Sequence, residues 1–496
     1  MSKLKYFGTD GIRGTAGQPP MEAGFVYRLG WAAAQVLCGA QNCRPRFLIG
    51  RDTRPSGPEL RDALTSGLLD AGADVADLGV LPTPAIAYLI SHTGASAGAV
   101  ISASHNPAAE NGIKFLNHLG MKLAEEQEAA IEQLLEQQDF TRLASTRPHQ
   151  VSDQSALYEE YLQDLLASAD GLDLHGMTVV LDCANGAASR AAPDIFNRLG
   201  ARVIAIHADP SAVINQQAGS EHVRSEPAAL AGLIRQTQAD LGIAFDGDAD
   251  RTILMDENGR LIDGDHMLAI LADFLHQQGL LRGNALVTTI MANGALSQYA
   301  TSRGFKLIET PVGDKYVTEA LLTLEAENPT RRGFGLGGEQ SGHIILLDES
   351  HHTGDGLRTA IYMLRALSGQ EKRSLAALAG SMQKYPQLVA SCNVARKPDL
   401  EEMNALKSQL ARLHQDLPGL VRLNSRYSGT EPKYRLMLET DPRHSAAEVA
   451  AKAWQICRLI QQETGTPPDA KIEVLNVAEG GLMPEPDRPQ DEESNE

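Results

Sequence analysis

The sequence predicts an α/β protein made of three similar mixed α/β domains in series and a smaller C-terminal α+β domain. The first observation behind this prediction is an internal repeat of strand, polar turn, helix and second strand. Copies of the repeat begin at the strand-like runs 46–49, Thr178–Asp182 and 285–290. The second observation is the length, because 496 residues exceed what one ordinary core accommodates.

The second and third copies of the repeat follow the order of a βαβ unit. Each strand leads into a turn with an Asn-Gly pair and then into a helical stretch that ends at glycine. The first copy has the polar loop 50–54 at the corresponding place. We place the domains at 1–153, 154–257, 258–373 and 374–480. The C-terminal domain differs from the other three. It has strand-like runs at 420–423, 434–438 and 471–475 and a stretch with helical spacing of apolar residues at 446–462, which predicts an α+β domain.

Composition and charge restrict the class of protein. The net charge of −19 argues against a nucleic-acid partner, although a local basic pocket still permits an anionic substrate. Five cysteines without CxxC spacing suggest reduced thiols and a cytoplasmic location. No apolar run approaches the ~18 residues of a membrane span, and the start has no apolar signal segment. Residues 481–496 are expected to form an acidic disordered tail.

A serine loop follows the apolar run Ala97–Ile101. Ser104 lies just beyond this run, where α/β folds present functional groups, and His105, Asn106 and Pro107 form a stiff turn that can expose its hydroxyl. No G-x-S-x-G pattern surrounds Ser104, which disfavours a hydrolase nucleophile. The alternative is a turn whose serine and asparagine side chains bond to their own backbone.

A carboxylate cluster follows the run Leu241–Phe245. Asp246, Asp248 and Asp250 occupy alternate positions, which in a loop brings three carboxylates together. Such charges repel unless they surround a divalent cation, and hard oxygen ligands favour Mg²⁺ or Ca²⁺. An EF-hand does not fit, because its sixth position requires glycine and here it is Arg251. Three solvated aspartates in a turn are the alternative.

Two further loops suit a phosphorylated sugar. A glycine run leads into Glu339 and Ser341, which can hydrogen-bond vicinal sugar hydroxyls. A dinucleotide site is disfavoured there, because the strand-like run 344–348 follows in place of a helix. The stretch 426–435 combines a glycine turn with hydroxyls and cations, a mixture that binds phosphate. For the loop with Glu339 and Ser341 the alternative is a plain turn that connects two strands. For the stretch 426–435 the alternative is a solvated surface.

Together the four loops resemble the α-D-phosphohexomutase superfamily, from about residue 5 to residue 475. The opening 6–14 and the loop variants 101–107 and 338–343 are most similar to the bacterial phosphoglucosamine mutase branch. Further matching stretches lie at 111–115, 312–317 and 353–356. The resemblance implies four domains around a central cleft, with one loop from each domain.

By residue match, the resemblance implies that Ser104 carries a phosphoryl group and completes a site for one Mg²⁺ per chain with Asp246, Asp248 and Asp250. The reacting phosphate would be lined by Arg13, Lys114 and Arg251. Glu339 and Ser341 would read the sugar, with His343 nearby; Lys114 and His343 are alternatives for the general base. The other phosphate would be held by Arg426, Ser428, Gly429, Thr430 and Arg435.

The implied activity interconverts glucosamine 6-phosphate and glucosamine 1-phosphate through a phosphoserine enzyme and a bisphosphorylated sugar, with hexose bisphosphate as activator. The implied partner is a hexosamine phosphate; the oligomeric state stays open, with a homodimer as one alternative. The sequence departs from the family pattern at Ala218, where cysteine is usual, and in the run 221–226. These departures leave phosphomannomutase or phosphoglucomutase activity, or a sugar-phosphate-binding paralogue without turnover, as alternatives.

Overall fold

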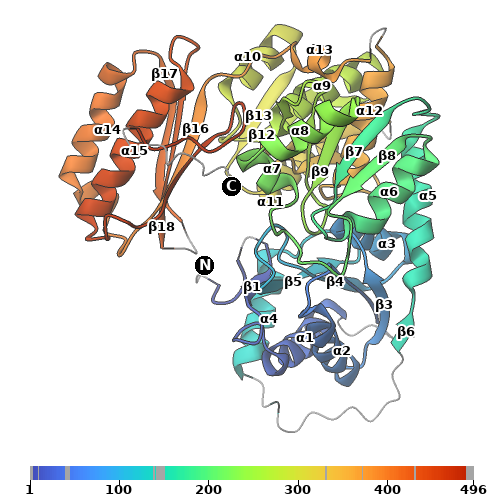
Figure 1. The fold of residues 1–496 in the computed structure, drawn as a ribbon. Helices are drawn as coiled ribbons and strands as arrows, with labels where there is room; N and C mark the ends of the chain where they lie inside the picture. Colours follow the sequence, from blue (N-terminus) through green and yellow to red (C-terminus); the bar gives the residue numbers. More distant parts are fainter. Residues whose placement is uncertain are drawn as a thin grey trace, which may run out of the picture. The chain divides into compact units, whose positions relative to one another are not determined.

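The structure is a computed structural model that describes residues 4–8, 10–38, 45–137, 140, 151–329, 332–370, 373–428 and 432–486. The chain forms two compact units (Figure 1). The larger unit comprises 1–223, 230–292 and 300–379, and the smaller comprises 224–229, 293–299 and 380–496. Among the helices described, none combines the length and the apolar character that crossing a membrane requires.

The first sheet of the larger unit has six strands in the order β1-β5-β4-β2-β3-β6. Its strands are β1 (Ile12–Thr15), β2 (Arg46–Arg51), β3 (Asp74–Val80), β4 (Ala97–Ile101), β5 (Glu110–Asn117) and β6 (Val151–Asp153). The helices are α1 (Ala23–Cys38), α2 (Gly57–Asp70), α3 (Thr83–Thr93) and α4 (Glu125–Gln137). α1, α2 and α4 pack on one face of the sheet, and α3 contacts β2 and β4 from the other (Figure 1).

The second sheet has the order β11-β10-β9-β7-β8. Its strands are β7 (Thr178–Asp182), β8 (Arg202–Ile206), β9 (Leu241–Phe245), β10 (Thr252–Met255) and β11 (Leu261–Ile262). The accompanying helices are α5 (Tyr158–Ala169), α6 (Ala188–Arg198), α7 (Ser220–Ser225) and α8 (Ala228–Thr237), and a 3₁₀ turn, η2 (Ser155–Leu157), precedes α5.

The third sheet has the order β13-β12-β14-β15. Its strands are β12 (Leu281–Thr289), β13 (Lys306–Thr310), β14 (Phe334–Gly338) and β15 (Ile344–Leu347). The helices of this segment are α9 (Gly264–Gln277), α10 (Gly294–Arg303), α11 (Asp314–Glu327), α12 (Gly356–Ser368) and α13 (Leu375–Ala379).

One strand plan recurs in all three sheets and places the polar loops at equivalent positions. A central parallel strand (β2, β7 or β12) is flanked by two parallel neighbours, and one neighbour (β4, β9 or β14) pairs with an antiparallel return strand (β5, β10 or β15). The serine, aspartate and glutamate loops each join that neighbour to its return strand. The repeat seen in the sequence is therefore a structural repeat that also aligns the loops.

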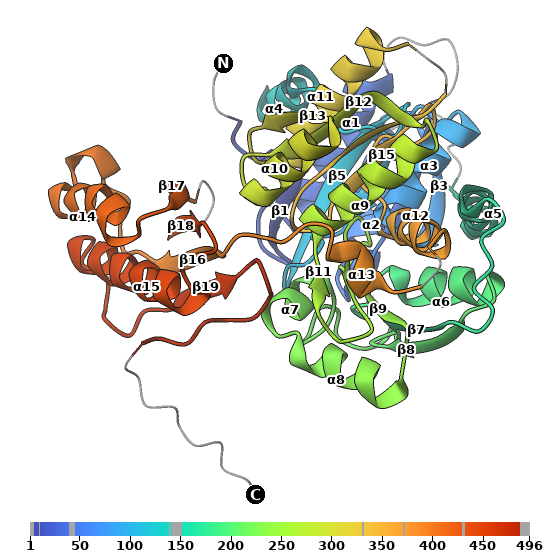
Figure 2. The ribbon, with the colours of Figure 1, turned by 90° about the horizontal axis from the view of Figure 1, so that it is seen from above.

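The smaller unit holds a four-stranded antiparallel sheet of order β17-β18-β16-β19. Its strands are β16 (Gln387–Asn393), β17 (Leu420–Tyr427), β18 (Lys433–Thr440) and β19 (Ile472–Asn476). The helices α14 (Asn404–Asp416) and α15 (Ala446–Glu463) cover one face of the sheet (Figure 2), and a 3₁₀ turn, η3 (Leu400–Glu402), precedes α14. This is the α+β arrangement that the sequence predicts, with β16 as an additional central strand.

Candidate active site

Ser104 lies directly beyond the carboxyl end of β4. Its side chain is buried, and its backbone has φ +52°, in the left-handed region that residues with a Cβ rarely adopt. The Ser104 hydroxyl donates a hydrogen bond of 2.6 Å to Oδ2 of Asp246. The serine and aspartate loops, which come from different sheets, therefore meet at the two residues that the sequence singles out.

The aspartate loop holds three carboxylates close together. Asp246, Asp248 and Asp250 are all buried, and one carboxylate oxygen from each lies within 4.8 Å of the others. Thr83 Oγ1 donates to Asp248 Oδ2 at 2.7 Å, and the Arg251 backbone N–H donates to Asp246 Oδ1 at 3.1 Å. The return strand β10 follows the loop directly, so the carboxylates stand between two strands and not in an EF-hand.

The charge in this cluster fits a divalent cation. Burial and the negative charges of Asp250 and Asp248 raise the pKa of Asp246 well above its usual range. Asp248 Oδ1 is buried and accepts no hydrogen bond from the described residues. Three adjacent buried carboxylates, one of which resists ionisation beside the others, with an oxygen left for a further partner, form an oxygen-rich site of the kind that Mg²⁺ or Ca²⁺ occupies.

The cations predicted to line a phosphate surround this cluster. Lys114, on β5, places Nζ 3.2 Å from Asp248 Oδ2 and 3.5 Å from Asp250 Oδ2. Burial opposes its charge, but Asp10, Asp248 and Asp250 outweigh burial and raise the pKa of Lys114. Arg251 Nε lies 3.8 Å from Asp250 Oδ1. Arg13, on β1, donates to Asn106 Oδ1 at 3.3 Å and also contacts Asp10.

The third loop brings His343 to the aspartates. His343 is buried, with Nδ1 3.7 Å from Asp250 Oδ1 and Nε2 3.6 Å from Asp314 Oδ2. Glu339 and Ser341 are partly exposed in the same loop, and the Glu339 N–H donates to the His343 carbonyl at 3.0 Å. After Asp250 and Asp246, the negative charge of Glu339 also contributes to the raised pKa of Arg251, so the carboxylate of Glu339 lies near the guanidinium of Arg251.

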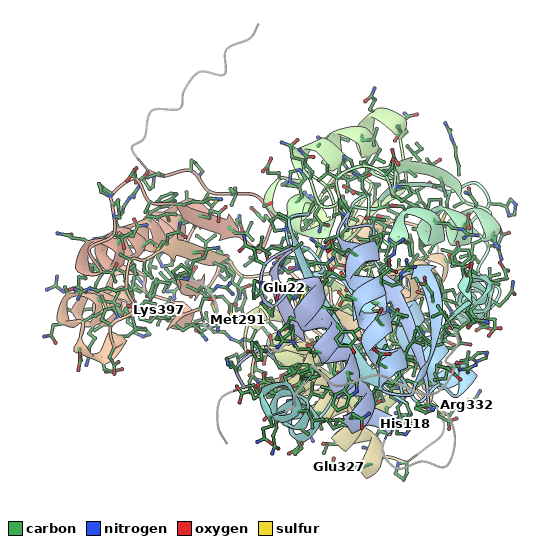
Figure 3. The ribbon with its side chains drawn as sticks, turned by 90° about the horizontal axis from the view of Figure 1, so that it is seen from below. Glu22, His118, Met291, Glu327, Arg332 and Lys397 are labelled. Carbon is green, nitrogen blue, oxygen red and sulfur yellow. The ribbon has the colours of Figure 1, made fainter. Side chains whose placement is uncertain are left out.

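The predicted phosphate cradle joins β17 to β18 in the smaller unit. Arg426 and Arg435 are directly opposed in this strand pair. Burial, and then the positive charge of Arg435, lower the pKa of Arg426, as expected where two cations gather for an anion. The Ser428 N–H donates to the Lys433 carbonyl at 2.8 Å, and Lys397 (labelled in Figure 3) donates to the Ser428 carbonyl at 2.6 Å. Gly429 and Thr430 lie outside the described residues.

Family models match most of the chain. The phosphoglucomutase/phosphomannomutase alpha/beta/alpha domain I matches residues 4–142, domain II matches 158–259 and domain III matches 263–385. The chain belongs to the phosphoglucomutase/phosphomannomutase family. The predicted fold class and the predicted resemblance to the phosphohexomutases are thereby confirmed, and with them the class of enzyme, a phosphosugar mutase.

Curated members of this family match over nearly the full chain. A phosphoglucosamine mutase of Symbiobacterium thermophilum is 43% identical over 89% of this chain and 96% of its own length. Those of Geobacillus kaustophilus and Methylobacillus flagellatus are 41% and 42% identical, each over 93% of this chain and 99% of their own length. These matches confirm the resemblance to the bacterial phosphoglucosamine mutase branch.

Solved structures of the family share the fold. A phosphoglucomutase/phosphomannomutase family protein of Burkholderia thailandensis has a TM-score of 0.70 at 21% identity, covering 94% of this chain and 98% of its own. An N-acetylphosphoglucosamine mutase of Aspergillus fumigatus, solved with GlcNAc-6P and magnesium, has a TM-score of 0.60 at 16% identity, covering 93% and 96%. At these identities the likeness concerns the fold.

Several charged residues that the structure places beside the cluster escaped prediction from the sequence. Asp10 contacts Lys114 at 2.9 Å and Lys122 at 2.7 Å, and Lys122 reaches Asp314 at 2.6 Å. Asp10 and Asp314 lie in motif stretches that match the family, a signal that marked them without suggesting a role. Lys122 lies past the turn that follows β5, in an isolated antiparallel bridge to Leu116, and carries no such signal. The sequence predicts only a turn position for His105, and its Nδ1 lies 3.4 Å from Ser104 Oγ.

Proposed function

We propose that this phosphosugar mutase interconverts glucosamine 6-phosphate and glucosamine 1-phosphate, with Ser104 as the residue that carries the phosphoryl group. The observation that carries this proposal is the 2.6 Å hydrogen bond between Ser104 Oγ and Asp246 Oδ2, inside a ring of cations. The choice of the amino sugar is supported by the names of the curated relatives, which are phosphoglucosamine mutases.

In the proposed reaction, phosphorylated Ser104 donates its phosphoryl group to the free hydroxyl of the sugar monophosphate. The P–O bond to Ser104 breaks, a P–O bond to the sugar forms, and the hydroxyl proton passes to a base. Lys114 and His343, which both approach Asp250, are the alternatives for that base. The sugar bisphosphate then turns around and returns its other phosphoryl group to Ser104.

The charged side chains explain why such a transfer is favoured here. Phosphoryl transfer depends on alignment and on neutralising the oxygens of the group in flight. Lys114, Arg251 and Arg13 supply fixed positive charge around Ser104. Asp246, Asp248 and Asp250 would hold one Mg²⁺, which when bound supplies Lewis-acid stabilisation of the phosphoryl oxygens.

Sugar recognition is assigned to two other loops. Glu339 and Ser341, partly exposed beside the return strand β15, would accept from and donate to the sugar hydroxyls. The non-reacting phosphate would bind Arg426, Ser428, Gly429, Thr430 and Arg435. Because the bisphosphate must bind in both orientations, this second phosphate site has to accept either phosphate. Hexose bisphosphate would act as the activator by transferring a phosphoryl group to Ser104.

The cysteines support a cytoplasmic location for the proposed enzyme. Cys183, Cys392 and Cys457 are buried free thiols. Unpaired cysteines are typical of reducing compartments.

The test is turnover followed by ³¹P NMR, with Mg²⁺ and a trace of glucose 1,6-bisphosphate. Glucosamine 6-phosphate, glucose 6-phosphate and mannose 6-phosphate are offered separately, and we expect the amino sugar to be converted fastest. Faster conversion of glucose or mannose phosphate would replace the substrate and keep the mechanism. No conversion by protein with phosphorylated Ser104 would favour a binding paralogue without turnover.

Ser104→Ala should abolish conversion of every substrate, because the acceptor oxygen is gone. Intact-mass measurement should also show no phosphoryl addition after incubation with the bisphosphate. Ser211→Ala, at an exposed serine, is the matched control and should retain both activities. Retained turnover in Ser104→Ala would contradict the role of Ser104.

A further inference from the structure

A buried arginine holds the backbone of the serine loop. Arg54 lies in the polar loop after β2, and its side chain is fully inaccessible to solvent. Its guanidinium donates five hydrogen bonds of 2.6 to 2.9 Å, to the carboxylate of Asp52 and to the carbonyls of Ser104, Asn106, Pro107 and Glu110. A guanidinium has five N–H donors, so all the guanidinium donors of Arg54 bind acceptors in this region.

Asn215 binds two of the same carbonyls from the second sheet's segment. Its Nδ2 donates to the Ser104 carbonyl at 2.8 Å and to the Asn106 carbonyl at 3.0 Å. Both partners only accept hydrogen bonds, so the NH₂ end of the amide is the end that must face them. The two carbonyls therefore each receive one donor from Arg54 and one from Asn215.

The backbone N–H of Ser104 is held as well. Asp52, which pairs with Arg54, accepts a 2.6 Å hydrogen bond from the Ser102 hydroxyl, and Ser102 Oγ accepts the Ser104 N–H at 2.9 Å. Both polar backbone groups of Ser104 are thus anchored to buried side chains. A left-handed conformation at a non-glycine residue persists only where its surroundings enforce it, and these contacts are the enforcing ones.

We propose that Arg54 and Asn215 form a clamp that positions Ser104, and that this clamp sets the direction of the Ser104 hydroxyl toward Asp246. Neither side chain reaches the reacting atoms, so both are positioning residues. The proposal rests on the proposed role of Ser104 in phosphoryl transfer. Because that serine would act in both half-reactions, loosening the clamp should slow each of them while the contacts to the sugar remain intact.

The kinetic test uses Arg54→Lys, Asn215→Ala and the double variant in the full-length protein. Arg54→Lys keeps the charge but cannot serve five acceptors, and we expect kcat to fall on the order of 10²-fold, the size of effect that an ångström-scale misplacement produces. Asn215→Ala should lower kcat by a smaller factor. The KM for the sugar phosphate should stay within about twofold of the wild-type value in each variant.

The double variant tests whether the two residues form one clamp. Each donor can retain the shared carbonyls when the other is removed, so kcat of Arg54→Lys/Asn215→Ala should fall by more than the product of the single losses. A purely multiplicative loss would show that the two residues act separately and would overturn the shared clamp.

Arg282→Lys is the matched control. Arg282 is also buried, and it donates to Glu325 at 2.6 Å and to the Gly333 carbonyl at 3.1 Å, away from the serine loop. It should lower the thermal midpoint without changing kcat, which is measured well below the midpoint of every variant. If Arg54→Lys and Asn215→Ala behave like this control, the clamp is only structural and the proposal fails.

A second readout measures Ser104 directly. The initial rate at which glucose 1,6-bisphosphate phosphorylates Ser104, followed by intact mass, should fall in parallel with kcat. If Arg54→Lys does not fold, Asn215→Ala alone decides: an unchanged phosphorylation rate overturns the proposal. Failure of the proposed function would differ, because the wild-type protein itself would then acquire no phosphoryl group and convert no substrate.

Discussion

The ionisable side chains around Ser104 are joined in a continuous network. Asp10 lies 2.9 Å from Lys114 and 2.7 Å from Lys122, and Lys122 lies 2.6 Å from Asp314, the first residue of α11. Removing one partner of a buried ion pair strongly destabilises the folded protein, because the other charge is left buried and unpaired. Each member of the network therefore constrains the next, which keeps residues from the first and third sheet segments together beside the aspartates.

Glu128, on α4, gives a prediction about pH and stability. Burial, with a contribution from the charge of Glu125, raises the pKa of Glu128 to about 7 from an ordinary value of 4.5. The folded state thus binds a proton more tightly than the unfolded state. As the pH rises from 4.5 to about 7, ionisation of this side chain therefore lowers the free energy of unfolding. Glu128→Gln should stabilise the protein at pH 8 by about 1 kcal/mol, a value reduced for partial exposure.

The gain should shrink as the pH is lowered from 8 to 5.5, because the wild-type carboxyl then becomes neutral in the folded state. Urea unfolding of the wild type and of Glu128→Gln at several pH values measures this difference in stability. Glu126→Gln, at a neighbouring exposed position of the same helix, is the control and should change stability little at any pH. A pH-independent gain for Glu128→Gln would contradict the assigned cause.

At the scale of elements, α1 and α2 are packed closely enough to require glycine. A Cβ added at Gly67 of α2 would lie 1.9 Å from the Tyr27 carbonyl oxygen of α1, and one added at Gly30 would lie 2.5 Å from the Leu64 carbonyl oxygen. No methyl group fits at such distances. The two helices cover the same face of the first sheet as α4, so this contact helps to hold the layer that supports β2 and β4 (Figure 1).

Two Gly→Ala substitutions should therefore change stability in opposite directions. Gly67→Ala forces α1 and α2 apart and should destabilise the larger unit by about 1–3 kcal/mol. Gly232→Ala, in α8, meets no atom within 4 Å of the new Cβ and should stabilise by about 0.5–1 kcal/mol through helix propensity. Thermal unfolding of both variants measures the two changes in stability. A loss of stability in Gly232→Ala as large as that in Gly67→Ala would refute the steric explanation.

At the scale of the whole molecule, each unit has its own hydrophobic core. The core of the smaller unit draws on the strands β16, β18 and β19 and the helices α14 and α15. The sequence contains two tryptophans, and the units hold one each: Trp31 in α1 and Trp454 in α15. Proteins with separate cores often depart from two-state unfolding, and these side chains report on the units individually.

We expect the two tryptophans to detect different responses to Mg²⁺. In Trp454→Phe, Trp31 fluorescence should show a urea midpoint that rises with Mg²⁺, because the aspartate cluster belongs to the larger unit and ligand binding stabilises the folded state. In Trp31→Phe, Trp454 fluorescence should show a midpoint that Mg²⁺ leaves unchanged. Adding Asp248→Asn should remove the Mg²⁺ response of Trp31, and a response that survives would place the metal elsewhere.

Much of the fold was predictable because its signals are local. The strands Ala97–Ile101, Thr178–Asp182 and Leu241–Phe245 have the bounds expected from their apolar runs, and α15 spans the stretch with helical spacing. The strand β16 was missed, since a central strand between two antiparallel neighbours is recognised mainly by its partners. The family resemblance predicts that Ser104 meets Asp246, and the structure brings the two together.

The sequence by itself determined the chemistry of the loops, because hydroxyls, carboxylates and cations at short spacing are read from neighbouring residues. Only the tertiary structure decided which distant residues support them. Arg54 and Asn215 lie 50 and 111 residues from Ser104, and Lys122 lies 192 residues from Asp314. Periodicity and turn chemistry are properties of a short segment, whereas a buried charge finds its partners through the order in which the strands of three repeated sheets are assembled.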